Sequence, residues 1–271
     1  LLPDRGELKS RHPEGGTSSF ESATKDLSVR ESVLAFLPEE VAVKILVVDV
    51  GGNNIKLLAT GQKTPRKVPS GPDLTPRRMV AGIKKAIPDW EWDVATIGYP
   101  GAVKDGHPVL EPKNLGEGWV KYDFKRALGK PVRIINDAAM QALGSYEGGR
   151  MLFLGLGTGL GAALVLEGLV QPMELAHLKY DDGQTYEEHL GKKAQDRLGK
   201  KRWRKEVERI VMDLYAAFQV DEVVIGGGNA KQLKEIPDIA RLGSNRNAFA
   251  GGFRLWTDPL AGKRTHRPRR K

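Results

Sequence analysis

The side chains best suited to proton transfer in this sequence belong to Asn136 and Asp137, which follow an expected buried strand and open an expected helix. A carboxylate at that place can accept the proton of a substrate hydroxyl while a phosphoryl group is transferred to it. The competing interpretation is that Asp137 merely caps the helix, a common use of aspartate. Asp137 is therefore the candidate general base, with capping as the alternative.

Two glycine-rich turns could hold phosphate groups. The first spans residues 51–53 and is followed by Lys56, and the second spans residues 157–159. Glycines let backbone N–H groups approach an anion without an intervening Cβ, and a lysine adds positive charge. One such turn alone is more often an ordinary hairpin, but two matched turns and a third run at 226–229 favour phosphate binding. Asp49, just before the first turn, is placed to hold Mg²⁺ through a water.

An acid and a histidine stand three residues apart at Glu174 and His177. Such a pair is suited to bidentate contacts with sugar hydroxyls, and the alternative is an ordinary surface pair. No second histidine lies at metal-ligand spacing, so a zinc site is not expected. Asn114, in the loop between Pro112 and Gly116, is a further polar candidate.

Alternating strands and helices must position these residues. Apolar runs predict strands over residues 44–50, 55–59, 94–99, 132–135, 151–156, 162–166 and 222–225. Apolar spacing and stop signals predict helices over residues 75–87, 137–145, 186–198 and 200–218, with a short one within 27–41. Residues 48–58 can be laid on residues 154–164, since each segment is a strand, a glycine-rich turn and a strand. This weak repeat predicts duplicated halves that face one another.

Two nucleotide-binding motifs are excluded. Residues 157–162 formally fit GxGxxG/A, but that pattern must lead into a helix, and strand-type sequence follows here. The chain contains no GxxxxGK[ST], so it has no Walker P-loop.

The composition is that of an ordinary globular protein, with 40% hydrophobic and 28% charged residues in a chain of 271. The absence of cysteine excludes disulfides, thiolate zinc sites, iron–sulfur clusters and a cysteine nucleophile. No apolar run is long enough to span a membrane, and no signal peptide is visible. We therefore expect no membrane partner and a cytoplasmic location.

The net charge of +9 is concentrated in two segments. Residues 192–209 carry nine basic and three acidic residues, residues 263–271 carry six basic and none acidic, and residues 1–40 are net acidic. Basic segments attract phosphate polyanions, whether nucleic acid or an inorganic chain. The alternative is a solvated helical face at 192–209 and a disordered tail.

Together these segments resemble the ROK family of sugar kinases, within the actin/hexokinase-like superfamily, with the closest likeness to its polyphosphate glucokinase branch. The set of segments is specific although each piece is not. The carrying segments follow the family's order and cover roughly 43–255: Asp49–Lys56, Gly98–Gly101, Lys113–Gly116 with Trp119, Asn136-Asp137, Gly155–Gly161, Glu174–His177 and Gly226–Ala230.

The resemblance implies an α/β fold of two lobes, actin-like and ribonuclease-H-like, with duplicated β-sheets and an active-site cleft between the lobes. The expected divisions are a disordered extension over 1–40, a first lobe over 41–136, a second over 137–260 and a basic tail over 261–271. The implied reaction is phosphoryl transfer from polyphosphate, ATP or both to the 6-hydroxyl of a hexose, with glucose the expected sugar and Mg²⁺ the cofactor. A homodimer is compatible with the family.

The resemblance also assigns roles to individual residues. Asp137 would be the general base. Lys56 and Asp49 keep the phosphate-binding and water-mediated magnesium roles argued above. The implied sugar-binding residues are Asn114, Asn136, Glu174, His177 and, more weakly, Glu187; the donor phosphates would meet Gly51, Gly52, Asn53, Gly157, Thr158 and Gly159; and a nucleotide would meet Gly226, Gly227, Gly228 and Asn229.

Three features depart from the family pattern. Asn53 stands where threonine or serine is usual, so the geometry of the first turn should differ. The cysteine-rich zinc motif of many members is absent, as in the polyphosphate branch. Ala176 replaces a glycine between Glu174 and His177 and should cost that loop backbone freedom.

Other functions stay open. ROK relatives include repressors, so a non-catalytic sugar-binding regulator is the main alternative, although residues 1–40 are short and acidic for an added DNA-binding module. A nucleic-acid-binding protein acting through the basic segments is less favoured, and an actin-like filament protein least. The donor is also open, because residues 192–209 favour polyphosphate and residues 226–229 favour ATP.

Overall fold

The computed structural model describes residues 43–258. The expected helix within 27–41, the extension over 1–40 and the tail over 261–271 lie outside the described residues. Within the described part, every helix is too short or too polar to cross a membrane.

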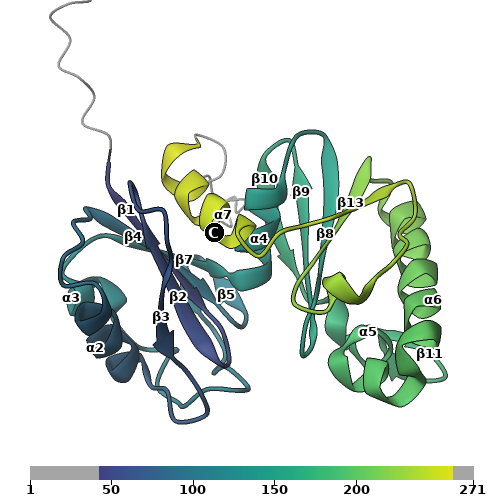
Figure 1. Cartoon of the computed structure of the whole chain (residues 1–271), viewed down its shortest axis with the longest axis horizontal. Coiled ribbons are helices and arrows are strands. Elements are labelled where there is room, and N and C mark those ends of the chain that lie inside the picture. The colour runs from purple at the N-terminus through teal and green to yellow at the C-terminus, as the bar shows by residue number, and fades with distance from the viewer. Residues whose placement is uncertain (1–42, 259–271) are drawn as a thin grey trace, which may run out of the picture. The chain divides into compact units, whose positions relative to one another are not determined.

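The first sheet has five strands in the order β3-β2-β1-β4-β7 (Figure 1). The first three strands along the chain form an antiparallel meander, and β4 and β7 run parallel to β1. Since parallel strands end at the same edge of a sheet, Val50, Tyr99 and Asn136 lie along one edge. The strands are β1 (Ile45–Val50), β2 (Asn54–Ala59), β3 (Arg66–Pro69), β4 (Val94–Tyr99) and β7 (Val132–Asn136).

The second sheet repeats this topology, with the order β10-β9-β8-β13-β14. Again three antiparallel strands are followed by two parallel ones. The repeat expected from the sequence is therefore a duplication of whole five-stranded sheets, which confirms the two-lobed α/β fold. The strands are β8 (Arg150–Leu156), β9 (Leu160–Leu166), β10 (Leu169–Met173), β13 (Glu222–Gly226) and β14 (Ala240–Leu242).

The two glycine-rich turns differ in length by one residue. Val50 pairs with Ile55 across the first turn, whereas Leu156 pairs with Leu160 across the second. The first turn thus has four residues (51–54) and the second has three (157–159), so a residue-by-residue match of 48–58 to 154–164 is wrong after the turn. In the structural match, the facing pair Asp49 and Lys56 corresponds to a pair of glycines, 155 and 161.

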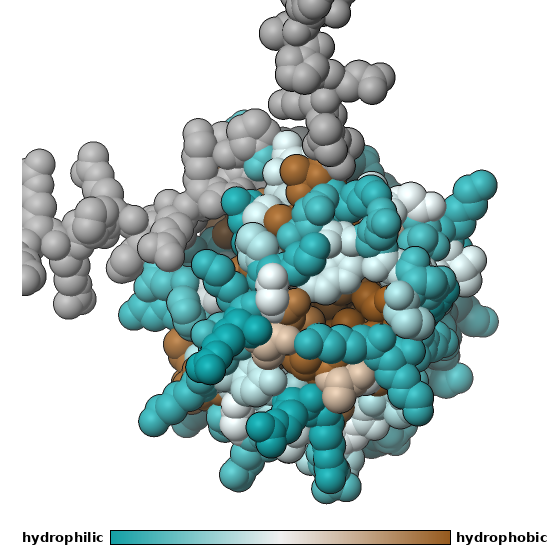
Figure 2. Space-filling view, turned by 90° about the vertical axis from the view of Figure 1, so that its left-hand side faces the viewer, coloured by the Kyte–Doolittle hydropathy of each residue, from teal (hydrophilic) through white to brown (hydrophobic). Residues whose placement is uncertain are grey.

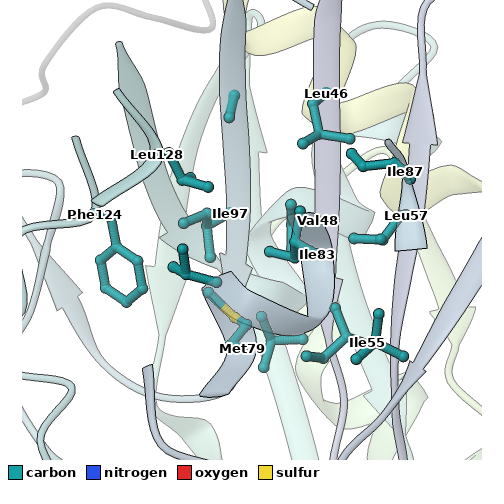
Figure 3. Packing of buried hydrophobic residues seen from close by; sticks show 14 of the residues in the cluster. Leu46, Val48, Ile55, Leu57, Met79, Ile83, Ile87, Ile97, Phe124 and Leu128 are labelled. Atoms are coloured by element: carbon teal, nitrogen blue, oxygen red, sulfur yellow. The ribbon is translucent and has the colours of Figure 1, made fainter. Parts of the chain in front are cut away.

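The two faces of each sheet belong to different hydrophobic clusters. Along β1, Leu46 and Val48 face α2 (Pro76–Ala86) and α3 (Phe124–Leu128), whereas Val47 faces the opposite way. Figure 3 shows this first cluster, with Met79 and Ile83 of α2 lying over β1 and β4. Central strands buried on both faces explain why the apolar runs in the sequence are continuous.

The helix α4 (Asp137–Ser145) packs on the inner faces of both sheets, and α7 (Asn247–Thr257) packs on α4 and on the inner face of the first sheet. α4 and α7 cross so closely that a Cβ on Gly144 or Gly251 would overlap the backbone of the other helix. α7, which the sequence analysis did not predict, therefore contributes to the support of the helix that carries the candidate base.

The predicted break at Gly199 is confirmed, because its φ of 75° and ψ of 156° are not helical and separate two helical stretches within α6 (Lys192–Phe218). The predicted helix over 186–198 is wrong in one respect, since α5 (Tyr186–Leu190) ends at Gly191 before α6 begins. The elements not predicted are β3, α3, β10, β14, α7, the 3₁₀ helices η1 (Leu175–His177) and η2 (Ala230–Gln232), and the hairpins β5 (Val103–Lys104)–β6 (His107–Pro108) and β11 (Lys179–Asp181)–β12 (Gln184–Thr185).

The side of the first sheet that α2 and α3 cover presents mainly hydrophilic side chains, with hydrophobic residues visible in recesses between them (Figure 2). Isolated apolar residues of this kind are normal on a protein surface.

Candidate active site

Asn136 and Asp137 make different hydrogen bonds at the start of α4. The Oδ1 of Asn136 accepts from the N–H of Ala139 at 3.0 Å, and its Nδ2 donates to the Gly101 carbonyl at 3.1 Å. Asn136 is therefore the residue that caps the helix. Asp137 occupies the first helical position, where its Oδ1 accepts from the N–H of Ala138 at 2.8 Å. The capping role that competed for Asp137 is thus filled by its neighbour.

The surroundings of Asp137 raise its pKa to about 7. Removal of the carboxyl from solvent is the main cause, and the negative charges of Asp49 and then Glu174 act in the same direction. Hydrogen bonds from the N–H groups of Ala138 and of Asp137 itself oppose the rise. A carboxyl that titrates near pH 7 can exchange a proton with a substrate at neutral pH.

Asp49 is nearly buried and forms an ion pair with Lys56, whose Nζ lies 2.9 Å from Oδ2. The lysine comes from β2 and meets Asp49 directly across the β1–β2 ladder. Two expectations are modified by this pair. Lys56 is held by a carboxylate next to the first turn, and Asp49 has one oxygen committed to the lysine.

A magnesium ion fits this arrangement only in a limited way. Mg²⁺ commonly takes one or two carboxylates, keeps several waters and completes its shell with substrate phosphates. The second oxygen of Asp49 could accept a hydrogen bond from such a water. Among the described residues no cluster of three or more acids, histidines or cysteines could hold a metal by itself.

Glu174 and His177 lie at the two ends of η1, and both side chains are exposed. His177 Nε2 is 3.9 Å from Glu174 Oε2, too far for a hydrogen bond, so neither side chain fixes the other. Ala176 is buried within the 3₁₀ helix and is absent from the described non-glycine residues with positive φ. The expected loss of backbone freedom at Ala176 therefore has no consequence in this conformation.

Asn114 lies beside the first turn, since a Cβ added to Gly52 would be 3.9 Å from the Asn114 Cβ. Asn114 is exposed. The loop that carries it is tied down by Glu111, whose carboxylate accepts from the N–H groups of Trp119 and Val120 at 3.0 and 3.2 Å. The first turn itself is tied to Ser70, whose hydroxyl donates to the Gly51 carbonyl at 2.7 Å and whose N–H donates to the Asn53 carbonyl at 3.1 Å.

The second turn is held through its carbonyl groups. The N–H of Lys192, at the start of α6, lies 3.2 Å from the Gly157 carbonyl and 3.3 Å from that of Thr158. The Asn229 side chain also donates to the Gly157 carbonyl, at 2.9 Å. Glu187, the weaker sugar-binding candidate, reaches this turn, where its Oε2 accepts from the N–H of Leu160 at 3.2 Å.

The third glycine run packs against the second turn. A Cβ on Gly226 would meet the Phe153 ring, and one on Gly227, which has φ +85°, would overlap the backbone of Leu156. These two glycines have a structural reason to be glycine. Only Gly228 has open space where a Cβ would lie, so it is the member of the run best placed to face a ligand.

The candidate residues form two groups that α4 joins. The first group is electrostatic: the charges of Asp49 and Glu174 act on Asp137, and Lys56 forms an ion pair with Asp49. The second group lies at the second turn, where Glu187 and Asn229 make hydrogen bonds. Gly161, just after that turn, lies against Ala138 of α4, where a Cβ would come within 2.7 Å of the alanine Cβ. Across the described residues, no hydrogen bond joins the first turn to the second.

A cavity of about 930 Å³ lies along the edge strands β7 and β10. Of the predicted site residues only Asn136 lines it. The cavity therefore lies beside the candidate base and not at the two glycine turns, so it is no evidence for the predicted cleft.

Two residues that position the site were missed from the sequence. Ser70 and Glu111 hold the first turn and the Asn114 loop through hydrogen bonds spanning 19 and 8 or 9 residues. A serine between Pro69 and Gly71 indicates only a loop, and a lone glutamate in a loop indicates only solvation. No signal in the sequence distinguished them.

Comparison with known proteins finds similarity to sugar kinases and to one family model. The family model described as "ROK family" matches residues 45–172. Among curated proteins, a polyphosphate glucokinase of Mycobacterium leprae (strain TN) is 27% identical over 208 residues, covering 69% of this chain and 60% of that protein. A polyphosphate glucokinase of Mycobacterium tuberculosis (strain ATCC 25618 / H37Rv) is 26% identical over 207 residues, covering 68% of this chain and 77% of that protein. The chain thus spans less than two thirds of the leprae relative's length.

Solved structures show the same fold. An inorganic polyphosphate/ATP-glucomannokinase from Arthrobacter sp. strain KM superposes with a TM-score of 0.66 at 22% identity, covering 78% of this chain and 97% of that one. A ROK family glucokinase from Streptomyces griseus, in complex with glucose and AMPPNP, superposes with a TM-score of 0.64 at 17% identity, covering 78% of this chain and 98% of that one. A ROK family transcriptional regulator superposes with a TM-score of 0.63 at 16% identity, covering 87% of this chain and 86% of that one.

Proposed function

We propose that this chain, a member of the ROK family, is a sugar kinase that transfers a phosphoryl group from polyphosphate, ATP or both to the 6-hydroxyl of a hexose, with glucose as the expected sugar. The observation that carries the proposal is Asp137, placed at the first turn of a helix that Asn136 caps, with its pKa raised to about 7. A residue serving only as a cap would have no need of this environment.

In this mechanism Asp137 accepts the proton of the sugar hydroxyl as the hydroxyl oxygen attacks the terminal phosphoryl group. Asn114, Asn136, Glu174 and His177 would orient the sugar ring, since exposed amide, acid and imidazole groups can bind hydroxyls. Mg²⁺ held through the water side of Asp49 would supply neutralisation of the donor's negative charge. The backbone of the turns at 51–54 and 157–159 would meet the donor phosphates.

The choice of donor rests on α6 and on Gly228. Lys200, Lys201, Arg202 and Lys205 are exposed, and within the described residues no acid pairs with them. An unpaired basic stretch favours a long polyanion such as polyphosphate. The open space at Gly228 favours a nucleotide. Relatives named for polyphosphate and a neighbour named for both donors support the same pair of candidates.

A sugar-responsive regulator without catalysis is the second candidate, because the fold matches a ROK transcriptional regulator as well as it matches kinases. The raised pKa of Asp137 favours the kinase. A homodimer remains a prediction from the family resemblance, and a cytoplasmic location remains a prediction from the sequence.

The test is production of glucose 6-phosphate with Mg²⁺, with polyphosphate and ATP supplied in separate reactions. We expect product from at least one donor. Sugar binding in calorimetry without product from either donor would replace the kinase with the regulator.

A further inference from the structure

Glu187 lies on the second turn and not in open solvent. It belongs to α5, whose start is fixed by a capping box between Thr185 and Glu188. Its Oε2 accepts from the Leu160 N–H at 3.2 Å. A Cβ on Gly159 would overlap the same oxygen, so the carboxylate occupies the space beside Gly159 that the missing side chain leaves free.

The remaining polar groups of this turn show where an anion could bind. The carbonyls of Gly157 and Thr158 are taken by Lys192 and Asn229, and the N–H of Gly157 donates to the Gly159 carbonyl at 3.0 Å. The N–H groups of Thr158 and Gly159 have no acceptor among the described residues. The donor groups left for a phosphate therefore lie next to the one that Glu187 already occupies.

A carboxylate and a phosphate cannot share these amides without cost. Both are anions, and like charges a few ångströms apart repel strongly where water is partly excluded. For a donor phosphate to settle on this turn, Glu187 has to move away or lose its charge. An uncharged ligand rich in hydroxyl donors, such as a hexose, could draw the carboxylate off the turn by hydrogen bonding to it.

We propose that Glu187 is a positioning residue that blocks the second turn to phosphate until a sugar engages its carboxylate. This rests on the proposed function. Sugar binding then strengthens donor binding, and in the absence of sugar the donor is held poorly and is protected from transfer to water. The order of binding is set by the position of one carboxylate.

The test measures binding of AMPPNP and of tripolyphosphate, each with Mg²⁺, by calorimetry with and without saturating glucose. For the native protein we expect glucose to tighten donor binding at least about 5-fold, the lower end of ordinary coupling between sites. In Glu187→Gln, which keeps the shape and removes the charge, donor binding without glucose should tighten about 3-fold or more. The effect of glucose should then fall below about 2-fold.

Release of phosphate from ATP or polyphosphate without sugar gives a second readout, and it should rise in Glu187→Gln. A merely structural glutamate would not move these quantities in that direction. Glu188→Gln is the matched control, because it removes the same charge from the same helix while its carboxylate contacts Thr185 and not the turn. Glu187→Ala replaces the test variant if Glu187→Gln does not fold.

The outcomes separate the two proposals. If the native protein makes glucose 6-phosphate but Glu187→Gln retains the full effect of glucose on donor binding, the role of Glu187 is wrong and the kinase stands. Equal donor binding with and without glucose in the native protein also overturns it. If the native protein binds no donor and makes no product, both proposals fall.

Discussion

At the scale of single residues, the local environment gives the neighbours Asn136 and Asp137 different interactions. The Asn136 side chain hydrogen-bonds to the Ala139 N–H and the Gly101 carbonyl, whereas the negative charges of Asp49 and Glu174 help to raise the pKa of Asp137. The pair at Asp49 and Lys56 brings a further charge of each sign to the same edge of the sheet. A residue's role here follows from which neighbours the fold supplies.

The pH dependence of turnover tests Asp137. A base must be ionised to accept a proton, and burial with nearby negative charge raises the pKa of Asp137 to about 7. Activity in kcat/KM should therefore rise with pH through about 7, because below that value the carboxyl is protonated. Asp137→Asn should lower kcat at least about 100-fold and remove this limb.

Asp123→Asn is the control for that experiment. Asp123 also accepts an N–H at the start of a helix, from Arg126 at 2.9 Å, but it belongs to α3. The same chemical change there should leave the pH profile intact. Near-native turnover by Asp137→Asn would exclude Asp137 as the base.

At the scale of elements, the close packing of α7 against α4 supports the helix that begins with Asp137. α4 lies between the inner faces of the two sheets, and its backbone touches that of α7 at Gly144 and Gly251. Glycine lowers helix propensity by about 1 kcal/mol, so α7, with two adjacent glycines, is a poor helix by itself. Its helical state depends on tertiary packing.

Substitution at the crossing should destabilise the protein. In Gly251→Ala the new Cβ would overlap the Met140 carbonyl, and overpacking of this kind costs about 1–3 kcal/mol. We expect the melting temperature to fall by at least about 3 °C in a thermal denaturation experiment. Gly228→Ala is the stability control, because no atom lies within 4 Å of its added Cβ. Equal melting temperatures for the two variants would contradict the close crossing.

At the scale of the whole molecule, charge is distributed unevenly between the elements. The body carries its basic excess along α6, where Gly199 bends the helix and Trp203 is fully buried with its Nε1 donating to the Leu190 carbonyl at 3.0 Å. The tryptophan anchors the helix while neighbouring lysines stay in solvent. A polyanion would meet a positioned basic surface instead of a loose chain.

Salt should weaken polyphosphate use more than ATP use. A phosphate chain held by several lysines is released as salt competes, with a slope that follows the number of contacts. Replacing both Lys201 and Lys205 with glutamine should raise KM for polyphosphate and reduce its log–log salt slope by about 1.4, or about 0.7 for each lost contact, with KM for ATP unchanged.

A double substitution of Arg77 and Lys85 to glutamine controls for net charge, because both side chains are exposed on α2. If it changes polyphosphate KM and salt slope as much as the α6 variant does, the effect belongs to overall charge and not to α6.

The sequence by itself determined the elements whose pattern is local. The strands over 45–50 and 94–99 and the helix over 137–145 carry apolar runs and caps that needed no partner for their recognition. It also carried a resemblance to the ROK family, whose model matches residues 45–172. The predicted site residues stay predictions, although their neighbours are now defined.

Only the tertiary structure decided which groups meet. α7 has glycines that discourage a helix until α4 packs against them, and Ser70 and Glu111 act through hydrogen bonds to backbone groups that no local pattern reveals. The contact of Glu187 with the turn before Leu160 spans 27 residues. Burial and electrostatic interaction depend on distances in space, which the order of residues along the chain does not contain.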